Sequence, residues 1–180
     1  MELCYLVCTV VAVLLHGAGH VLAAALVGAR FGRLRISATG LRLVTERSFA
    51  SYRAEAVTAL GGPLLNLVGA WGAHALLGER GAVFVVLSLY LGLLNLAPIR
   101  GFDGARVLSC FLCARHALLP SCLPHVAERV IDVLSATLTL LLWLIAVYLL
   151  LRRGSALSLY VFCLQLFRSV VFDNPQKSSI

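Results

Sequence analysis

Charge-free apolar runs, separated by short polar stretches, extend over most of this chain. The first run covers residues 3–27 without a formal charge, and a helix needs roughly 20 apolar residues to cross a bilayer. Later apolar runs that we expect to be helical cover 54–77, 82–97, 105–119, 131–151 and 156–172. The pattern predicts one all-α, polytopic membrane domain, residues 1–180, with about five to six membrane helices.

The polar stretch Arg30–Arg53, between the first two runs, has a different periodicity. From Arg33 to Thr45, apolar and basic residues alternate around a turn that contains Gly40. This alternation predicts a small β-hairpin after the first span, with one apolar and one basic face. Leu34 and Ile36 are apolar positions of its first strand. A basic segment that lies flat on anionic lipid is the alternative interpretation.

Composition and charge agree with a membrane protein and exclude other classes. The chain is 61% hydrophobic with a mean hydropathy of +0.95, which leaves no room for a separate soluble domain. Its formal net charge of +7 comes from loop arginines, which are not clustered as in nucleic-acid-binding proteins. The arginines predict a multi-pass protein of the cell membrane, with the N-terminus outside and the Arg30–Arg53 loop cytoplasmic. The basic turn at 152–153 falls on the outer side in this topology, against the same rule.

Two histidines, His16 and His20, interrupt the first apolar run. Residues four apart lie on one face of a helix, so the two imidazoles are expected side by side at membrane depth. Ionisable groups are costly there and mark functional sites, and two helical histidines can share one zinc ion. A polar contact between the pair and a neighbouring helix explains these two residues equally well.

A second interruption, from Asn95 to Gly104, ends a later apolar run. It contains Pro98 and a single carboxylate, Asp103. Non-helical backbone at membrane depth is tolerated only where it is buried in protein or lines a cavity. Two histidines and one carboxylate are the protein ligands of a common catalytic zinc site, whose fourth position stays open. The carboxylate therefore favours the metal interpretation of the histidine pair.

These motifs resemble the site-2 protease family of intramembrane zinc metalloproteases. That family carries His-Glu-x-x-His on one membrane helix and Asn-x-x-Pro-x-x-x-x-Asp-Gly on a later one. The second motif matches in full at Asn95, Pro98, Asp103 and Gly104. A softer match runs from Gly62 to Asn66 and resembles the family's Gly-Pro-x-x-Asn. The resemblance covers roughly residues 10–115, with its motifs in the family's order.

The resemblance implies an enzyme that cleaves membrane-spanning proteins and that binds one zinc ion through His16, His20 and Asp103. In such enzymes zinc lowers the pKa of a water molecule and polarises the scissile carbonyl. The family also places a small sheet where the hairpin is expected, to grip its substrate. An unwound substrate could pair with an open strand edge at Leu34 and Ile36, which would resatisfy its backbone groups.

One position departs from the family pattern. The glutamate that serves the family as general base and acid falls on Gly17 here, and loss of such a group usually costs about 10²–10⁴-fold in rate. The second hypothesis is therefore a pseudoprotease that keeps the fold and binds membrane partners. A membrane haem carrier or transporter is a third hypothesis, but that class gives no reason for the Asn95–Gly104 spacing.

A separate set of residues has spacing that suits a second metal site: Cys110, Cys113, His116, Cys122 and His125. Together they contain enough thiols and imidazoles to close a tetrahedral zinc site. The first two cysteines fall in an apolar helical stretch, where buried thiols commonly act as small fillers. We favour the filler interpretation.

Overall fold

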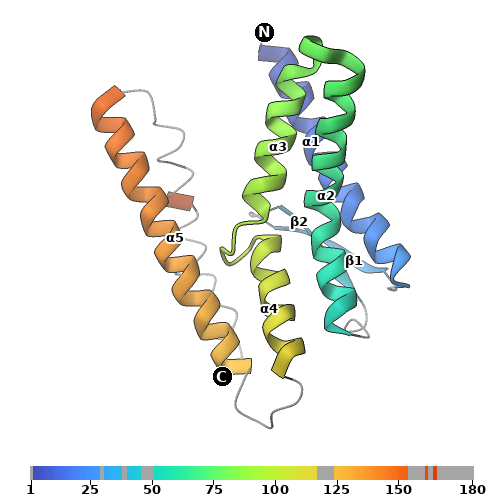
Figure 1. The fold of residues 1–180 in the computed structure, drawn as a ribbon, viewed down its shortest axis with the longest axis vertical. Helices are drawn as coiled ribbons and strands as arrows, with labels where there is room; N and C mark the ends of the chain where they lie inside the picture. Colours follow the sequence, from blue (N-terminus) through green and yellow to red (C-terminus); the bar gives the residue numbers. More distant parts are fainter. Residues whose placement is uncertain are drawn as a thin grey trace.

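The computed structural model describes residues 2–28, 31–37, 40–45, 51–116 and 124–153, together with 161 and 164–165. Its elements in chain order are α1 (Glu2–Leu26), β1 (Phe31–Ser37), β2 (Gly40–Thr45), α2 (Tyr52–Leu77), the 3-10 turn η1 (Gly78–Gly81), α3 (Ala82–Asn95), α4 (Asp103–His116) and α5 (Pro124–Arg153). α2 packs against α1, α3 and α4, and α4 continues the course of α3, while α5 runs along one side of the molecule (Figure 1).

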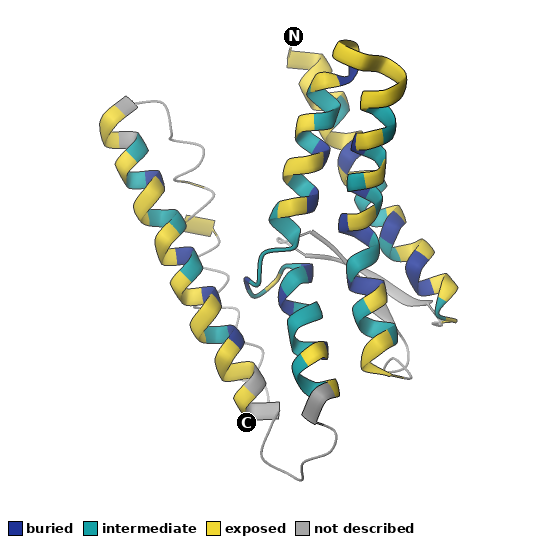
Figure 2. Cartoon of the chain, in the orientation of Figure 1, coloured by how far each residue is buried: buried dark blue, intermediate teal, exposed yellow. Residues whose placement is uncertain are grey.

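The helices pack through small residues and turn large apolar side chains outward. Buried apolar positions of the helices include Ala12, Ala23, Ala24, Ala59, Ala70 and Ala146. Large apolar side chains on the outer surface include Leu26, Trp71, Leu76 and Leu151, and exposed positions cover much of each helix (Figure 2). Small residues between helices and apolar residues outside are typical of helices packed in lipid. The chain is a membrane protein.

The expected number of membrane helices is wrong. Within the described residues, three helical segments are long and apolar enough to cross a bilayer: Glu2–Leu26, Tyr52–Asn95 and Glu128–Leu149. The prediction took residues 82–97 as a span and 105–119 as a helix that completes or extends it, and in the structure α3 and α4 have 14 residues each. At about 1.5 Å per residue, such a helix is too short for a bilayer core of about 30 Å. The run at 156–172 falls almost wholly outside the described residues.

α2 begins and ends at residues suited to those positions. Ser51 is in extended conformation before the helix, and its hydroxyl accepts a hydrogen bond from the Ala54 N–H at 3.2 Å. Such a cap satisfies one of the free N–H groups of the first turn. At the other end Gly78 takes a positive φ of 53°, and its N–H donates to the carbonyl of His74. A glycine adopts this conformation without steric cost.

The chain between α3 and α4 turns tightly and places Asp103 at the first position of α4. Gly101 has a φ of 99°, a conformation that favours glycine. A Cβ on Gly104 would overlap the backbone carbonyl of Leu96. The two glycines therefore let α4 start directly against the end of α3, where Asp103 faces the neighbouring helices.

The same turn is fastened to α5. The Arg100 N–H donates to the Ser135 hydroxyl at 2.8 Å, and that hydroxyl donates to the carbonyl of Pro98 at 3.4 Å. The Arg100 side chain also forms an ion pair with Asp132. Backbone that has left its helix is thus satisfied by polar groups of α5, as membrane depth requires.

The segment after α1 contains two short strands. β1 and β2 pair antiparallel, with Leu34 opposite Leu43 and Ile36 opposite Leu41. The pairing register is irregular between Phe31 and Arg33. The side chains of Leu34 and Ile36 lie outside the described part of the structure. Their expected role in gripping substrate stays a prediction.

Candidate metal centre

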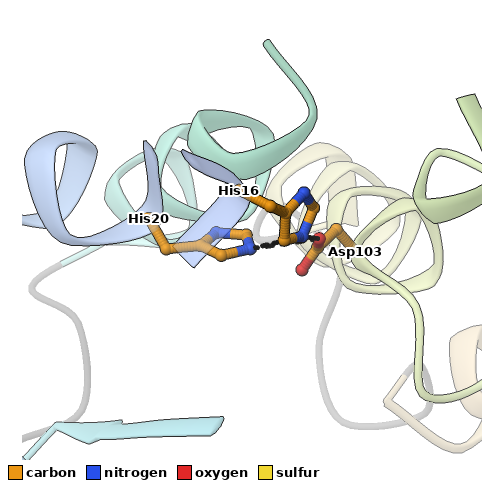
Figure 3. A group of neighbouring side chains, drawn as sticks. All are labelled: His16, His20 and Asp103. Atoms are coloured by element: carbon orange, nitrogen blue, oxygen red, sulfur yellow. Dashed lines mark hydrogen bonds and ion pairs between the residues drawn. The ribbon is translucent and has the colours of Figure 1, made fainter. Parts of the chain in front are cut away.

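Three side chains from two distant parts of the chain meet beside α2. His16 and His20 come from α1, and Asp103 comes from the start of α4 (Figure 3). The Nε2 atoms of the histidines are 3.1 Å apart, and each lies 3.2 Å from Oδ2 of Asp103. Asp103 is buried and both histidines are partly buried. The expected convergence of these residues is therefore present.

The spacing of the three atoms fits a tetrahedral metal site. Zinc ligands of this kind stand about 2.0–2.2 Å from the ion, so two of them are about 3.3–3.6 Å apart along a tetrahedral edge. The edges here, 3.1, 3.2 and 3.2 Å, are slightly shorter than those of an occupied site. His16, His20 and Asp103 are also the one group of metal-ligating side chains found among the described residues. The residues present therefore fit a zinc ion.

The other ring nitrogens of the histidines face α2. Nδ1 of His20 lies 2.8 Å from the carbonyl oxygen of Thr58, and Nδ1 of His16 lies 3.4 Å from Nδ2 of Asn66. A carbonyl oxygen can only accept, so it holds the His20 proton on Nδ1 and leaves Nε2 free for a metal ion. Such outer contacts orient metal-binding histidines in many proteins.

Glycines on α2 make room for the two imidazoles. A Cβ on Gly62 would overlap Nε2 of His20 and lie 2.8 Å from Cε1 of His16. One residue earlier, the backbones of Gly19 and Gly61 approach so closely that a Cβ on either would overlap the carbonyl oxygen of the other. The close approach of α1 and α2 thus places the histidine rings against α2, and the absence of a side chain at Gly62 leaves space for them.

Replacing Gly62 with alanine should damage the centre, because the added methyl group must displace His20 or separate the helices. Overpacking of this kind typically costs 1–3 kcal/mol, so we expect the free energy of unfolding to fall by about that amount. Gly72→Ala is the matched control on the same helix, since nothing lies within 4 Å of its added Cβ. That control should be neutral or stabilising by about 0.5–1 kcal/mol. Thermal unfolding in detergent measures both, and equal stability of the two variants would contradict the packing argument.

Two charged residues near the centre were not anticipated. Arg106 lies 3.9 Å from Oδ1 of Asp103 and 3.7 Å from a carboxylate oxygen of Glu55 on α2. It therefore faces the oxygen of Asp103 that does not point to the histidines. The spacing of 103 and 106 on one helix face was a usable signal. The contact of Arg106 with Glu55 and the contact of His20 with the Thr58 carbonyl could not be predicted, because no sequence pattern indicates them.

Gly17 lies next to His16 on a continuous helix, and no atom beyond its chain neighbours and the nearby backbone of α1 lies within 4 Å of the position its Cβ would take. Packing explains glycine at position 19, but it gives no reason for glycine at position 17. The structure therefore has open space beside Gly17, next to His16.

The other residues expected at the site have mixed placements. Asn66 and Gly104 adjoin the centre as described above. Asn95 donates from Nδ2 to the carbonyl of Leu91 at 2.9 Å, within its own helix, and the Pro98 carbonyl contacts α5. Of the residues weighed as a second metal site, Cys110 is buried and Cys113 partly buried, both as free thiols. The side chains of His116, Cys122 and His125 lie outside the described residues.

Comparison with known proteins finds similarity in structure but not in sequence. No protein-family model matches the sequence, and no curated protein matches it. Among solved structures, the chain is similar to the site-2 protease from Methanocaldococcus jannaschii, with a TM-score of 0.64 and 20% sequence identity. The match covers 97% of this chain and 77% of that one. The chain therefore has the fold of a site-2 protease.

Proposed function

We propose that this chain is an intramembrane zinc metalloprotease of the site-2 type, and that Gly17 leaves its proton-transfer step impaired. The observation that carries the proposal is the triangle of Nε2, Nε2 and Oδ2 atoms from His16, His20 and Asp103, with edges of 3.1–3.2 Å. The fold adds support, because it is shared with a site-2 protease.

In this proposal the centre lies within the bilayer. His16 follows the start of α1 by 14 residues, which places it about 21 Å along a helix that spans the bilayer. His16, His20 and Asp103 would hold one zinc ion. When bound, that ion supplies Lewis-acid polarisation of a carbonyl and a more acidic water. The substrate class that fits is therefore a membrane-spanning protein that unwinds locally, because a helix shields its own peptide bonds.

The protein's own residues have separable tasks in this scheme. Thr58 and Asn66 hold the outer ring nitrogens of the histidines, and Arg106 faces the second oxygen of Asp103. The task without an obvious residue is proton transfer, since Gly17 has no side chain. Another carboxylate described in this region, Glu55, contacts Arg106. Topology belongs to the proposal as well, with the N-terminus outside and the Arg30–Arg53 loop cytoplasmic.

The open space at Gly17 favours a second candidate, a pseudoprotease that binds membrane partners without cleaving them. A pseudoprotease would have the same fold and the same metal-binding residues as the impaired protease. The two candidates differ only in whether they cleave substrate. A haem carrier or transporter is less well supported, because neither needs a carboxylate within 3.2 Å of both histidines.

The two candidates separate in a reconstituted cleavage assay. The purified protein is placed in liposomes with a single-span helical substrate, with zinc or with a chelator, and both binding and cleavage are followed. A slow cleavage that the chelator abolishes supports the impaired protease. Substrate binding without cleavage, in this chain and in Gly17→Glu alike, supports the pseudoprotease. Absence of both binding and cleavage contradicts the proposed function.

A further inference from the structure

The two histidines of the metal centre have different partners at their outer nitrogens. His20 faces the carbonyl of Thr58 at 2.8 Å, whereas His16 faces the side-chain amide of Asn66 at 3.4 Å. A carbonyl oxygen is always an acceptor, but an amide offers a donor on one side and an acceptor on the other. The tautomer of His20 is therefore fixed, and that of His16 depends on which side of the amide it meets.

The amide of Asn66 lies with its nitrogen toward His16. In this orientation Nδ2 donates to Nδ1 of His16, so the single proton of the neutral ring stays on Nε2. Nε2 of His16 lies 3.2 Å from Oδ2 of Asp103 and 3.1 Å from Nε2 of His20, and either atom can accept a hydrogen bond from Nε2–H. Asp103 and Asn66 thus stabilise one tautomer together, and in that tautomer Nε2 of His16 has no lone pair for a metal ion.

Asn66 has an unused acceptor in this arrangement. Its side chain is 0% exposed, and Oδ1 is buried without a hydrogen-bond partner among the described residues. A half turn of the amide exchanges oxygen and nitrogen within nearly the same volume. Oδ1 would then face Nδ1 of His16, and the ring proton would have an acceptor on that side.

We infer that Asn66 is a positioning residue whose amide turns over when the metal centre is filled, and that it thereby sets the tautomer of His16. In the metal-free protein, Nδ2 donates to Nδ1 and Nε2–H donates to Asp103. With zinc bound, Nδ1–H would donate to Oδ1, and Nε2 would have its lone pair free to hold the ion. The ring loses a proton at one nitrogen and gains one at the other, so its charge is unchanged. The inference rests on the proposed metal centre and not on proteolysis.

The unmodified protein provides the first test. Nitrogen NMR of ring-labelled histidine, in detergent, distinguishes the two tautomers of each ring without and with added zinc ion. We expect His16 to carry its proton on Nε2 without zinc and on Nδ1 with zinc. His20 should carry its proton on Nδ1 before zinc is added and keep it there. A His16 ring already protonated on Nδ1 without zinc would overturn the inference.

Two substitutions of similar size provide the second test. Asn66→Asp offers only acceptors while its carboxylate is ionised, whereas Asn66→Leu offers none. Loss of an outer partner typically lowers metal affinity 10–100-fold, so we expect a loss of about that size for Asn66→Leu. Asn66→Asp should bind zinc at least as tightly as the parent and hold His16 in the Nδ1–H tautomer without zinc. Equal affinities for the two variants would show a packing role alone and overturn the inference.

These measurements separate the inference from the proposed function. A tautomer change in a protein that never cleaves substrate supports the inference and counts against the protease. If zinc binds and the tautomer of His16 does not change, the inference is overturned and the proposed protease function is unaffected. Failure of the parent to bind zinc through His16 overturns both.

Discussion

Replacing Gly17 with glutamate should raise the cleavage of a suitable membrane-spanning substrate by at least about 100-fold, which is the low end of the effect of a general acid–base group. The new carboxylate would follow His16 directly and has room, since nothing lies within 4 Å of its Cβ. It would accept a proton from the attacking water and return it to the leaving amine. The substitution should also stabilise α1 by about 0.5–1 kcal/mol, because glycine is a poor helix former.

The assay compares purified parent and Gly17→Glu proteins in liposomes, each with and without a chelator. Gly17→Gln is the matched control, because it has nearly the same size and cannot serve as the base. We expect the glutamine variant to stay as slow as the parent and all three proteins to bind zinc equally. If Gly17→Glu binds zinc and substrate but remains as inactive as the parent, the groove has diverged beyond this residue. Fast, chelator-sensitive cleavage by the parent would show that another group supplies the base.

Replacing Asp103 with alanine should lower zinc affinity by at least about 100-fold, since even outer-contact losses reach that size. Among the described residues, Asp103 supplies a carboxylate oxygen that lies 3.2 Å from Nε2 of each histidine. Two imidazoles alone would leave the ion with an incomplete set of protein ligands. Affinity is measured by competition with a chelator of known strength.

Asp132→Ala is the control for this substitution. Asp132 belongs to the same turn region, through its ion pair with Arg100, but its side chain is 47% exposed and it is not among the residues of the centre. That variant should bind zinc as the parent does. Both variants should retain the helix content of the parent. Unchanged zinc affinity in folded Asp103→Ala would contradict the ligand assignment.

The convergence of His16, His20 and Asp103 was predictable from sequence because their positions have a direct geometric meaning. An i,i+4 pair on an apolar helix places two imidazoles together whatever surrounds them. Asp103 was identified because a charge in an interrupted apolar run needs a reason. What holds the histidines was not predictable. The contact from Thr58 is a backbone carbonyl, which every residue has, and the need for glycine at 62 appears only when α1 and α2 are packed.

Two errors in the predicted helices, the number of membrane spans and the start of α5, also have physical causes. Hydropathy counts apolar runs, but it does not show that the run at 82–97 forms a helix of only 14 residues, α3, which is too short to cross a bilayer alone. The start of α5 was also placed late, at residue 131, whereas the helix begins at Pro124. Its first turns carry Glu128 and Arg129, which end an apolar run without ending a helix. Proline is well tolerated in the first turn.

The central claim is that His16, His20 and Asp103 bind one zinc ion inside the membrane domain. X-ray absorption at the zinc edge of the zinc-loaded protein tests it most directly, because nitrogen and oxygen ligands lie about 2.0–2.2 Å from zinc and thiolate sulfur lies about 2.3 Å away. We predict a shell of nitrogen and oxygen only, with two imidazoles, that loses one imidazole in His20→Ala. A sulfur ligand, as from Cys110 or Cys113, or a spectrum unchanged in His20→Ala, would contradict the claim.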